Sequence, residues 1–155
     1  MDPLQNSGFT GCLSKAGLAE GTNTITIKIA APNGAGVDFG VAGLAYHKAD
    51  TDNIAMNALA VQAVSSSCLY LVQITGANAV SLKKGNEVLT ADLTAGKNNL
   101  QWPFPDADNV ALGGIKVVTD ATATFTCGTT DLGAGNVTDT YYDFVGGLPE
   151  LPIVS

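Results

Sequence analysis

The amino-acid sequence predicts an all-β fold, and three observations support this prediction. Glycine occupies 18 of the 155 positions, and glycine at this level, with many threonines and valines, favours turns and pleated strands over long helices. Several segments alternate apolar and polar residues with the period of two expected of a half-buried strand. Residues that favour turns separate these segments. The length suits one domain with a core of its own.

The first predicted strand covers residues 24–30, where isoleucine occupies every second position. This alternation is the clearest strand pattern in the chain. The Pro-Asn-Gly sequence at 32–34 then signals a turn. Residues 36–46 (GVDFGVAGLAY) form the next predicted strand, with its larger apolar side chains on one face.

Residues 53–64 (NIAMNALAVQAV) are the one segment with a composition that suits a helix. Alanine, leucine and methionine favour a helix, and Asp52 or Asn53 would serve as its N-cap. The corresponding segment at 109–118 (NVALGGIKVV) contains two glycines and several β-branched residues, which indicates a strand. We therefore expect residues 53–64 to be extended, with a helix as the alternative.

The remaining strands are predicted from apolar runs and the turn residues between them. They cover residues 68–75, 79–93, 114–126 and 136–144. Lys-Gly-Asn at 84–86 predicts a hairpin turn inside the second of these segments. Asp-Ala at 120–121 predicts another inside the third, between 115–118 and 122–126.

Two similar stretches, residues 50–56 (DTDNIAM) and 106–112 (DADNVAL), place Asp-x-Asp-Asn before an apolar run. Side-chain oxygens of this kind bind Ca²⁺ in EF-hand loops. Such a loop also needs glycine at position 6 and glutamate at position 12, where both stretches have alanine and valine. We therefore interpret the acidic side chains as acceptors of backbone N–H bonds in turns, and we expect no metal site.

The two stretches also head an internal repeat. Gly-Ala-x-x-Val follows each of them at nearly the same separation, beginning at Gly76 and at Gly133. Each pair of motifs brackets a strand-rich segment that contains one cysteine. This pattern predicts two related β units that begin with equivalent turns.

The charge pattern argues against nucleic acid and membranes as partners. The net charge is −7, and all seven basic residues are lysines. Phosphate recognition relies on the bidentate arginine fork and on clustered positive charge, and anionic membranes repel an acidic chain. Polar residues divide the uncharged residues 53–82 into runs too short to span a bilayer, and the N-terminus shows no secretory signal. Charged residues make up only 14% of the chain, which suggests that partners cover part of its surface.

No motif in the chain predicts catalysis or a cofactor. Cys12, Cys68 and Cys127 are widely spaced and form no CxxC pair, so we expect free thiols that act as small hydrophobic residues. His47 is the single histidine, and we expect it to be solvated. Neither a GxSxG nucleophile turn nor a nucleotide-binding glycine motif is present. We expect no enzyme activity, no catalytic residue and no cofactor.

Trp102 lies in the proline-containing segment QWPFPDAD. We expect its ring to fill one end of the core. The alternative is an exposed aromatic patch, formed with Phe104, that binds a sugar or a protein partner.

The C-terminal segment FVGGLPELPIVS combines two glycines, two prolines and several aliphatic residues. Proline donates no N–H, so this segment does not continue a central strand and instead favours an extended arm across another surface. We divide the chain into an N-terminal arm (1–21), a β domain (22–145) and a C-terminal arm (146–155). The expected arm contacts are Leu148, Pro149, Leu151, Pro152, Ile153 and Val154.

Residues 114–147 (GIKVVTDATATFTCGTTDLGAGNVTDTYYDFVGG) resemble small virion proteins of tailed bacteriophages, specifically capsid decoration or cement proteins. The likeness lies in a short, weakly charged β domain rich in alanine, glycine, threonine and valine. Its last predicted strand, TDTYYDF, precedes an extended tail. The resemblance covers about the last two-thirds of the chain.

The resemblance implies a β-sandwich, jelly-roll-like, with extended arms at both ends. It implies a virion structural protein that forms homo-oligomers, dimers or trimers, and stabilises the phage head by bridging capsomers of the major capsid protein. Its location would be the outer capsid surface, after assembly in the host cytoplasm. A capsid lattice multiplies weak contacts, so modest patches and arms suffice. The alternative is a carbohydrate- or receptor-binding β-sandwich of a phage fibre or spike, with Trp102 and the aspartates as its ligand face.

Neither Asp-x-Asp-Asn stretch should bind a divalent ion tightly, because the later ligand positions are apolar in both. Thermal melting of the protein before and after treatment with a calcium chelator is expected to give the same midpoint. A midpoint that falls by several degrees after chelation would contradict the interpretation of these stretches as turns.

Overall fold

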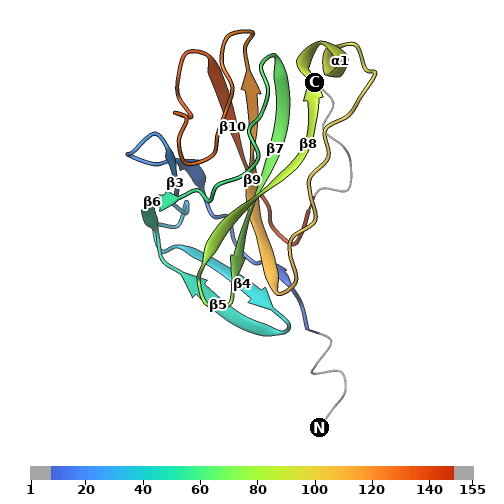
Figure 1. Cartoon of the computed structure of the whole chain (residues 1–155). Coiled ribbons are helices and arrows are strands. Elements are labelled where there is room, and N and C mark those ends of the chain that lie inside the picture. The colour runs from blue at the N-terminus through green and yellow to red at the C-terminus, as the bar shows by residue number, and fades with distance from the viewer. Residues whose placement is uncertain (1–7, 149–155) are drawn as a thin grey trace.

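The computed structural model describes residues 8–148 of the chain and confirms the all-β prediction (Figure 1). Within these residues the chain forms ten strands and one helix of five residues. The strands are β1 (Gly11–Cys12), β2 (Leu18–Glu20), β3 (Thr26–Ile29), β4 (Val37–Val41), β5 (Leu44–Lys48), β6 (Thr51–Ala55), β7 (Ser66–Thr75), β8 (Val80–Leu89), β9 (Asn109–Thr119) and β10 (Val137–Asp143). The helix, α1 (Thr90–Thr94), follows β8 directly and replaces the end of the strand that the sequence predicted at 79–93.

A four-stranded antiparallel sheet with the strand order β10-β9-β7-β8 forms the centre of the fold. Strand β7 pairs with β8 on one side and with β9 on the other. Its alternate side chains belong to different cores: Tyr70 and Val72 to a larger one, Leu69 and Leu71 to a smaller one. The continuous apolar run of β7 is therefore that of a strand covered on both faces.

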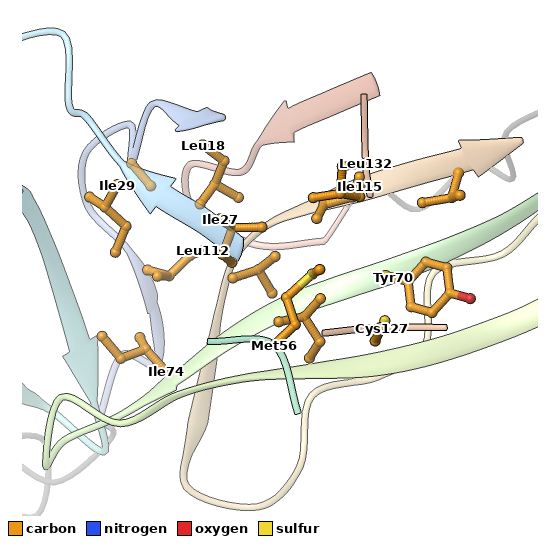
Figure 2. Close-up of a cluster of buried hydrophobic side chains, with 14 of the residues drawn as sticks. Leu18, Ile27, Ile29, Met56, Tyr70, Ile74, Leu112, Ile115, Cys127 and Leu132 are labelled. Atoms are coloured by element: carbon orange, nitrogen blue, oxygen red, sulfur yellow. The ribbon is translucent and has the colours of Figure 1, made fainter. Parts of the chain in front are cut away.

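Two three-stranded sheets enclose the larger core against the central sheet. Their strand orders are β1-β4-β5 and β2-β3-β6. In Figure 1, β3 and β6 lie on one side of the central sheet and α1 lies on the other. Figure 2 shows aliphatic side chains of the small sheets and of the central sheet converging with Met56, Tyr70 and Cys127 between the layers. This arrangement is consistent with a β-sandwich, in which the facing sides of the sheets form the core.

The smaller core covers the opposite face of the central sheet. Leu93 of α1, together with Leu100 and Trp102 of the following segment, packs there against β7 and Phe144. The Trp102 ring meets the Phe144 ring edge-on, with 4.9 Å between the ring centroids. The expected burial of Trp102 is confirmed, because only 9% of the residue is exposed.

A bulge in β9 allows this strand to serve both cores. Leu112 is an extra residue opposite β7, at the point where the pairing register shifts. The bulge changes the alternation of side chains, so that Leu112 and Ile115 both contact the larger core. Gly114 lies between them and has no Cβ, which leaves room for the Trp102 ring on the other face.

The hairpin turn predicted at residues 84–86 is wrong. Strand β8 continues through these residues, and the turn lies before it, at residues 76–79, where Asn78 has a φ of 63°. Gly85 instead allows a close approach, since the Gln101 carbonyl oxygen lies 2.8 Å from where its Cβ would be. Asn86 donates a side-chain N–H to the Asn99 carbonyl oxygen at 2.8 Å. A Gly-Asn pair suits both a turn and a place where two backbone segments come close together. The local sequence therefore did not distinguish these two roles.

Two further predictions about turns need correction. The single strand predicted at 36–46 is a hairpin of β4 and β5, turning at Ala42 and Gly43 with φ values of 49° and 83°. Alanine is uncommon at positive φ, which is why no turn was predicted there. After β9, residues 122–126 do not pair back onto it: Phe125 pairs with Gln62 through two backbone hydrogen bonds.

Part of the expected N-terminal arm belongs to the domain. Strand β1 pairs with β4, and β2 pairs with β3. Cys12, Ala16 and Leu18 are buried in the larger core. These strands are only two and three residues long, too short to show a periodic pattern in the sequence. Residues 1–7 lie outside the described residues.

Residues 53–64 contain no helix, as expected, and begin within β6. The prediction of two equivalent β units is wrong, however. The stretch at 50–56 runs through β6, at the edge of a small sheet, whereas the stretch at 106–112 turns into β9 of the central sheet. The same short motif therefore occurs in two different structural settings.

Replacement of Gly114 by alanine should lower the free energy of unfolding by about 1–3 kcal/mol, the usual cost of overpacking. The new Cβ would overlap the six-membered ring of Trp102. Gly135→Ala is the matched control, because no atom lies within 4 Å of its added Cβ. Guanidinium unfolding followed by tryptophan fluorescence measures both variants, and equal stabilities would contradict the packing described here.

Candidate interaction surface

The acidic side chains of the two Asp-x-Asp-Asn stretches connect neighbouring segments of the chain. Asp50 accepts a backbone N–H at 2.8 Å, and Asp52 accepts the N–H of Thr22 at 3.0 Å. Asp106 accepts from the Lys83 ammonium at 2.6 Å. The hydrogen bonds from Thr22 and from Lys83 hold the pKa of Asp52 and of Asp106 below the usual range. In residues 8–148, no three His, Cys, Asp or Glu side chains gather into a set that would hold a metal ion.

His47 is exposed on β5, as expected. Its Nδ1 lies 2.8 Å from Oδ1 of Asp38, the residue opposite it on β4. Both side chains are about half exposed, at 51% and 54%. An exposed cross-strand pair of this kind contributes little to stability. The pair is therefore a surface feature of the small sheet.

The three cysteines are buried free thiols, which confirms their expected hydrophobic role. Burial raises the pKa of Cys12 and Cys68 to about 11 and that of Cys127 to about 12. Burial likewise raises the pKa of Tyr70, whose hydroxyl donates to Oε1 of the buried Gln62 at 3.0 Å. These groups stay neutral and belong to the core, because the thiolate rather than the thiol is the nucleophile.

An apolar groove of about 240 Å³ opens where the two ends of the described chain come together. The segment leading into β1, the start of β9, and the chain after β10 contribute to it. Its lining residues are Thr10, Gly11, Phe104, Pro105, Asn109, Val110, Ala111, Gly147 and Leu148. We call this feature the Phe104 groove.

Backbone contacts fix the two chain ends beside the Phe104 groove. The N–H of Gly146 donates to the carbonyl oxygen of Cys12 at 2.7 Å. Gly11 permits this approach, since the Gly146 carbonyl oxygen lies 2.5 Å from where a Cβ of Gly11 would be. Gly146 itself has a φ of 89°, a conformation that favours glycine. The glycines of this region thus position a wall of the groove.

Phe104 is the most exposed large hydrophobic residue of the described chain, at 81%. Two residues earlier in the same segment, Trp102 is buried, so the two aromatic residues do not form one patch. Phe9 and Val145, adjacent in sequence to groove residues or to Gly146, are also exposed, at 46% and 55%. Exposed apolar residues gathered beside a groove mark an interaction site. The prolines on both sides of Phe104 are the sequence signal, since they keep this residue out of a paired strand.

The structure describes only one of the predicted arm contacts. Leu148 is partly buried and packs against the smaller core of its own chain, beside Tyr142. It also lines the Phe104 groove. At this residue the chain therefore contacts its own domain, contrary to the expectation of an outward contact. Pro149, Leu151, Pro152, Ile153 and Val154 lie outside the described residues.

Comparison with known proteins found no match for this chain. No protein-family model, no curated protein and no solved structure matches the chain. Among residues 8–148, no helix has the length and apolar character needed to cross a membrane. The features available for a functional argument are thus the β domain and the Phe104 groove.

The three thiols should not react with Ellman's reagent at pH 8 in the folded protein and should all react after unfolding in guanidinium, because they are buried and protonated. The folded state keeps these protons above pH 9 whereas the unfolded chain loses them, so stability should fall as the pH rises from 9 towards 12. A thiol that reacts rapidly in the folded protein would contradict this description.

Proposed function

We propose that the chain is a structural protein of a tailed-phage virion, a capsid decoration or cement protein that oligomerises and bridges capsomers from outside. The single observation that carries the proposal is the Phe104 groove, an open apolar site beside both ends of the described chain. A protein whose role is to bind to other proteins needs such a surface and does not need a set of catalytic residues. The resemblance of residues 114–147 supplies the virion context, and the jelly-roll topology it implies stays a prediction.

The surface composition supports attachment to protein partners. Charged residues make up only 14% of the chain, and the net charge is −7 without arginine. The central strand β7 is covered on both faces, so partners would meet the loops, chain ends and outer strands of the domain. Many copies on a lattice add weak contacts of this kind into firm attachment. We propose that sister copies and the major capsid protein are the partners.

The alternative is a carbohydrate- or receptor-binding domain of a phage fibre or spike. The exposed Phe104 favours it, because aromatic rings beside a groove suit sugar rings. Two observations weigh against it. Trp102 is buried, and about 240 Å³ is smaller than the roughly 300–1,000 Å³ typical of small-molecule sites. The groove is better matched to a few aliphatic side chains of a protein partner.

The test is to locate the chain in purified particles of the phage that encodes it. We expect it on the head, in a copy number comparable to that of the major capsid protein, by quantitative mass spectrometry and immunogold electron microscopy. Heads that lack it should release their DNA at a lower temperature. Labelling confined to tail fibres, together with glycan binding that Phe104→Ala abolishes, would instead establish the alternative function.

A further inference from the structure

The Phe104 groove lies where the described chain ends, and the sequence that follows suits it chemically. Gly147 and Leu148 form part of its lining. The seven residues after Leu148 (Pro-Glu-Leu-Pro-Ile-Val-Ser) include Leu151, Ile153 and Val154. The chain therefore carries an apolar groove and a short apolar segment of matching character within a few residues of each other.

The place where this segment begins and its length allow it to reach a neighbouring molecule. Prolines at 149 and 152 fix their own φ and disfavour helical conformations for Leu148 and Leu151. Leu148 is already held against the smaller core. Seven extended residues reach at most about 25 Å, which is enough to cross to a neighbouring molecule.

Part of the free edge of the central sheet, at β8, is already bonded to other segments of the same chain. Asn57 occupies the free edge there: its Oδ1 accepts the N–H of Leu82 at 2.6 Å, and its Nδ2 donates to the Leu82 carbonyl oxygen at 3.1 Å. Asn86 connects the same strand to residues 99 and 101. The backbone groups of Leu82 at this edge are therefore not available to another strand. The apolar groove offers a neighbouring copy a site that does not depend on strand pairing at this edge.

We propose that the Phe104 groove of one copy binds the apolar C-terminal tail, residues 149–155, of a second copy. Phe104 covers the aliphatic side chains of the incoming tail, and Val110 and Ala111 form part of the surface beneath it. If the exchange is reciprocal, it closes a symmetric dimer in which each copy supplies one groove and one tail. The inference deepens the proposed function, on which it rests, by naming the contact between sister copies.

The test uses two full-length variants that each lose one half of the contact. Phe104→Ser removes the groove aromatic, and its 81% exposure means that the fold should tolerate the change. Leu151→Ser/Ile153→Ser removes the apolar tail. Val61→Ser is the control, since Val61 is an exposed aliphatic residue (56%) that does not line the groove. Circular dichroism checks that every variant retains the wild-type β spectrum.

Sedimentation velocity over a concentration series gives the readout. We expect the wild type and Val61→Ser to form the same oligomer, and each half-contact variant to need at least a tenfold higher concentration to associate. An equimolar mixture of the two variants should form a one-to-one complex, because one intact groove meets one intact tail. Fluorophores on the two variants detect this complex by energy transfer. Three results would each overturn the inference: a monomeric wild type, a Phe104→Ser or Leu151→Ser/Ile153→Ser variant that associates like the wild type, or a mixture of these two variants without energy transfer.

The outcome is separable from that of the proposed function. A chain that decorates phage heads but associates independently of Phe104 and the tail overturns the tail exchange and leaves the function in place. A chain that exchanges tails as described but is absent from phage heads supports the inference and overturns the proposed function.

Discussion

The burial of β7 on both faces is the constraint on which the rest of this structure depends. Apolar side chains on both faces of β7 require that the strand be covered twice, once by the two small sheets and once by α1 and the segment after it. Its few polar side chains then need internal partners. Ser67 lies 3.1 Å from the Thr90 hydroxyl, and Gln73 donates to Asp106 at 2.7 Å. Because a buried polar group without a partner is costly, these bonds also fix the positions of α1 and of the turn before β9.

The two faces of the central sheet are covered by different kinds of segment, and the Phe104 groove results from this difference. The larger core is enclosed mainly by the two small sheets, with loop residues such as Phe125 and Leu132 between their strands and the central sheet. The smaller core is closed by one short helix and an irregular segment. That segment places Trp102 over Gly114 and then exposes Phe104. With β1 and the chain after β10 approaching from the other side, an apolar hollow remains at the end of the second face.

The buried polar network around Gln62 shows how a segment without regular structure is held in the larger core. The Gln62 side chain donates to the carbonyl oxygens of Ser66 and Val117, both at 3.1 Å, and accepts from Tyr70. Its backbone pairs with Phe125. One glutamine thereby connects the chain before β7, strand β9 and the loop after it. A fully satisfied network of this kind specifies one arrangement of the surrounding loops.

The sequence by itself determined the all-β class and the strands β3, β7 and β10, and it favoured the absence of a helix at residues 53–64 and the burial of Trp102 over their alternatives. These features follow from local periodicity, propensity and residue size, which act within a few positions of the chain. Only the tertiary structure decided that Gly85 allows a close approach instead of a turn, that Leu112 is a bulge, and that β1 and β2 belong to the domain. It also decided that Phe104 borders a groove, because a hollow exists only where segments far apart in sequence meet. Such contacts join residues that are far apart in the sequence, so the pattern of neighbouring residues does not predict them.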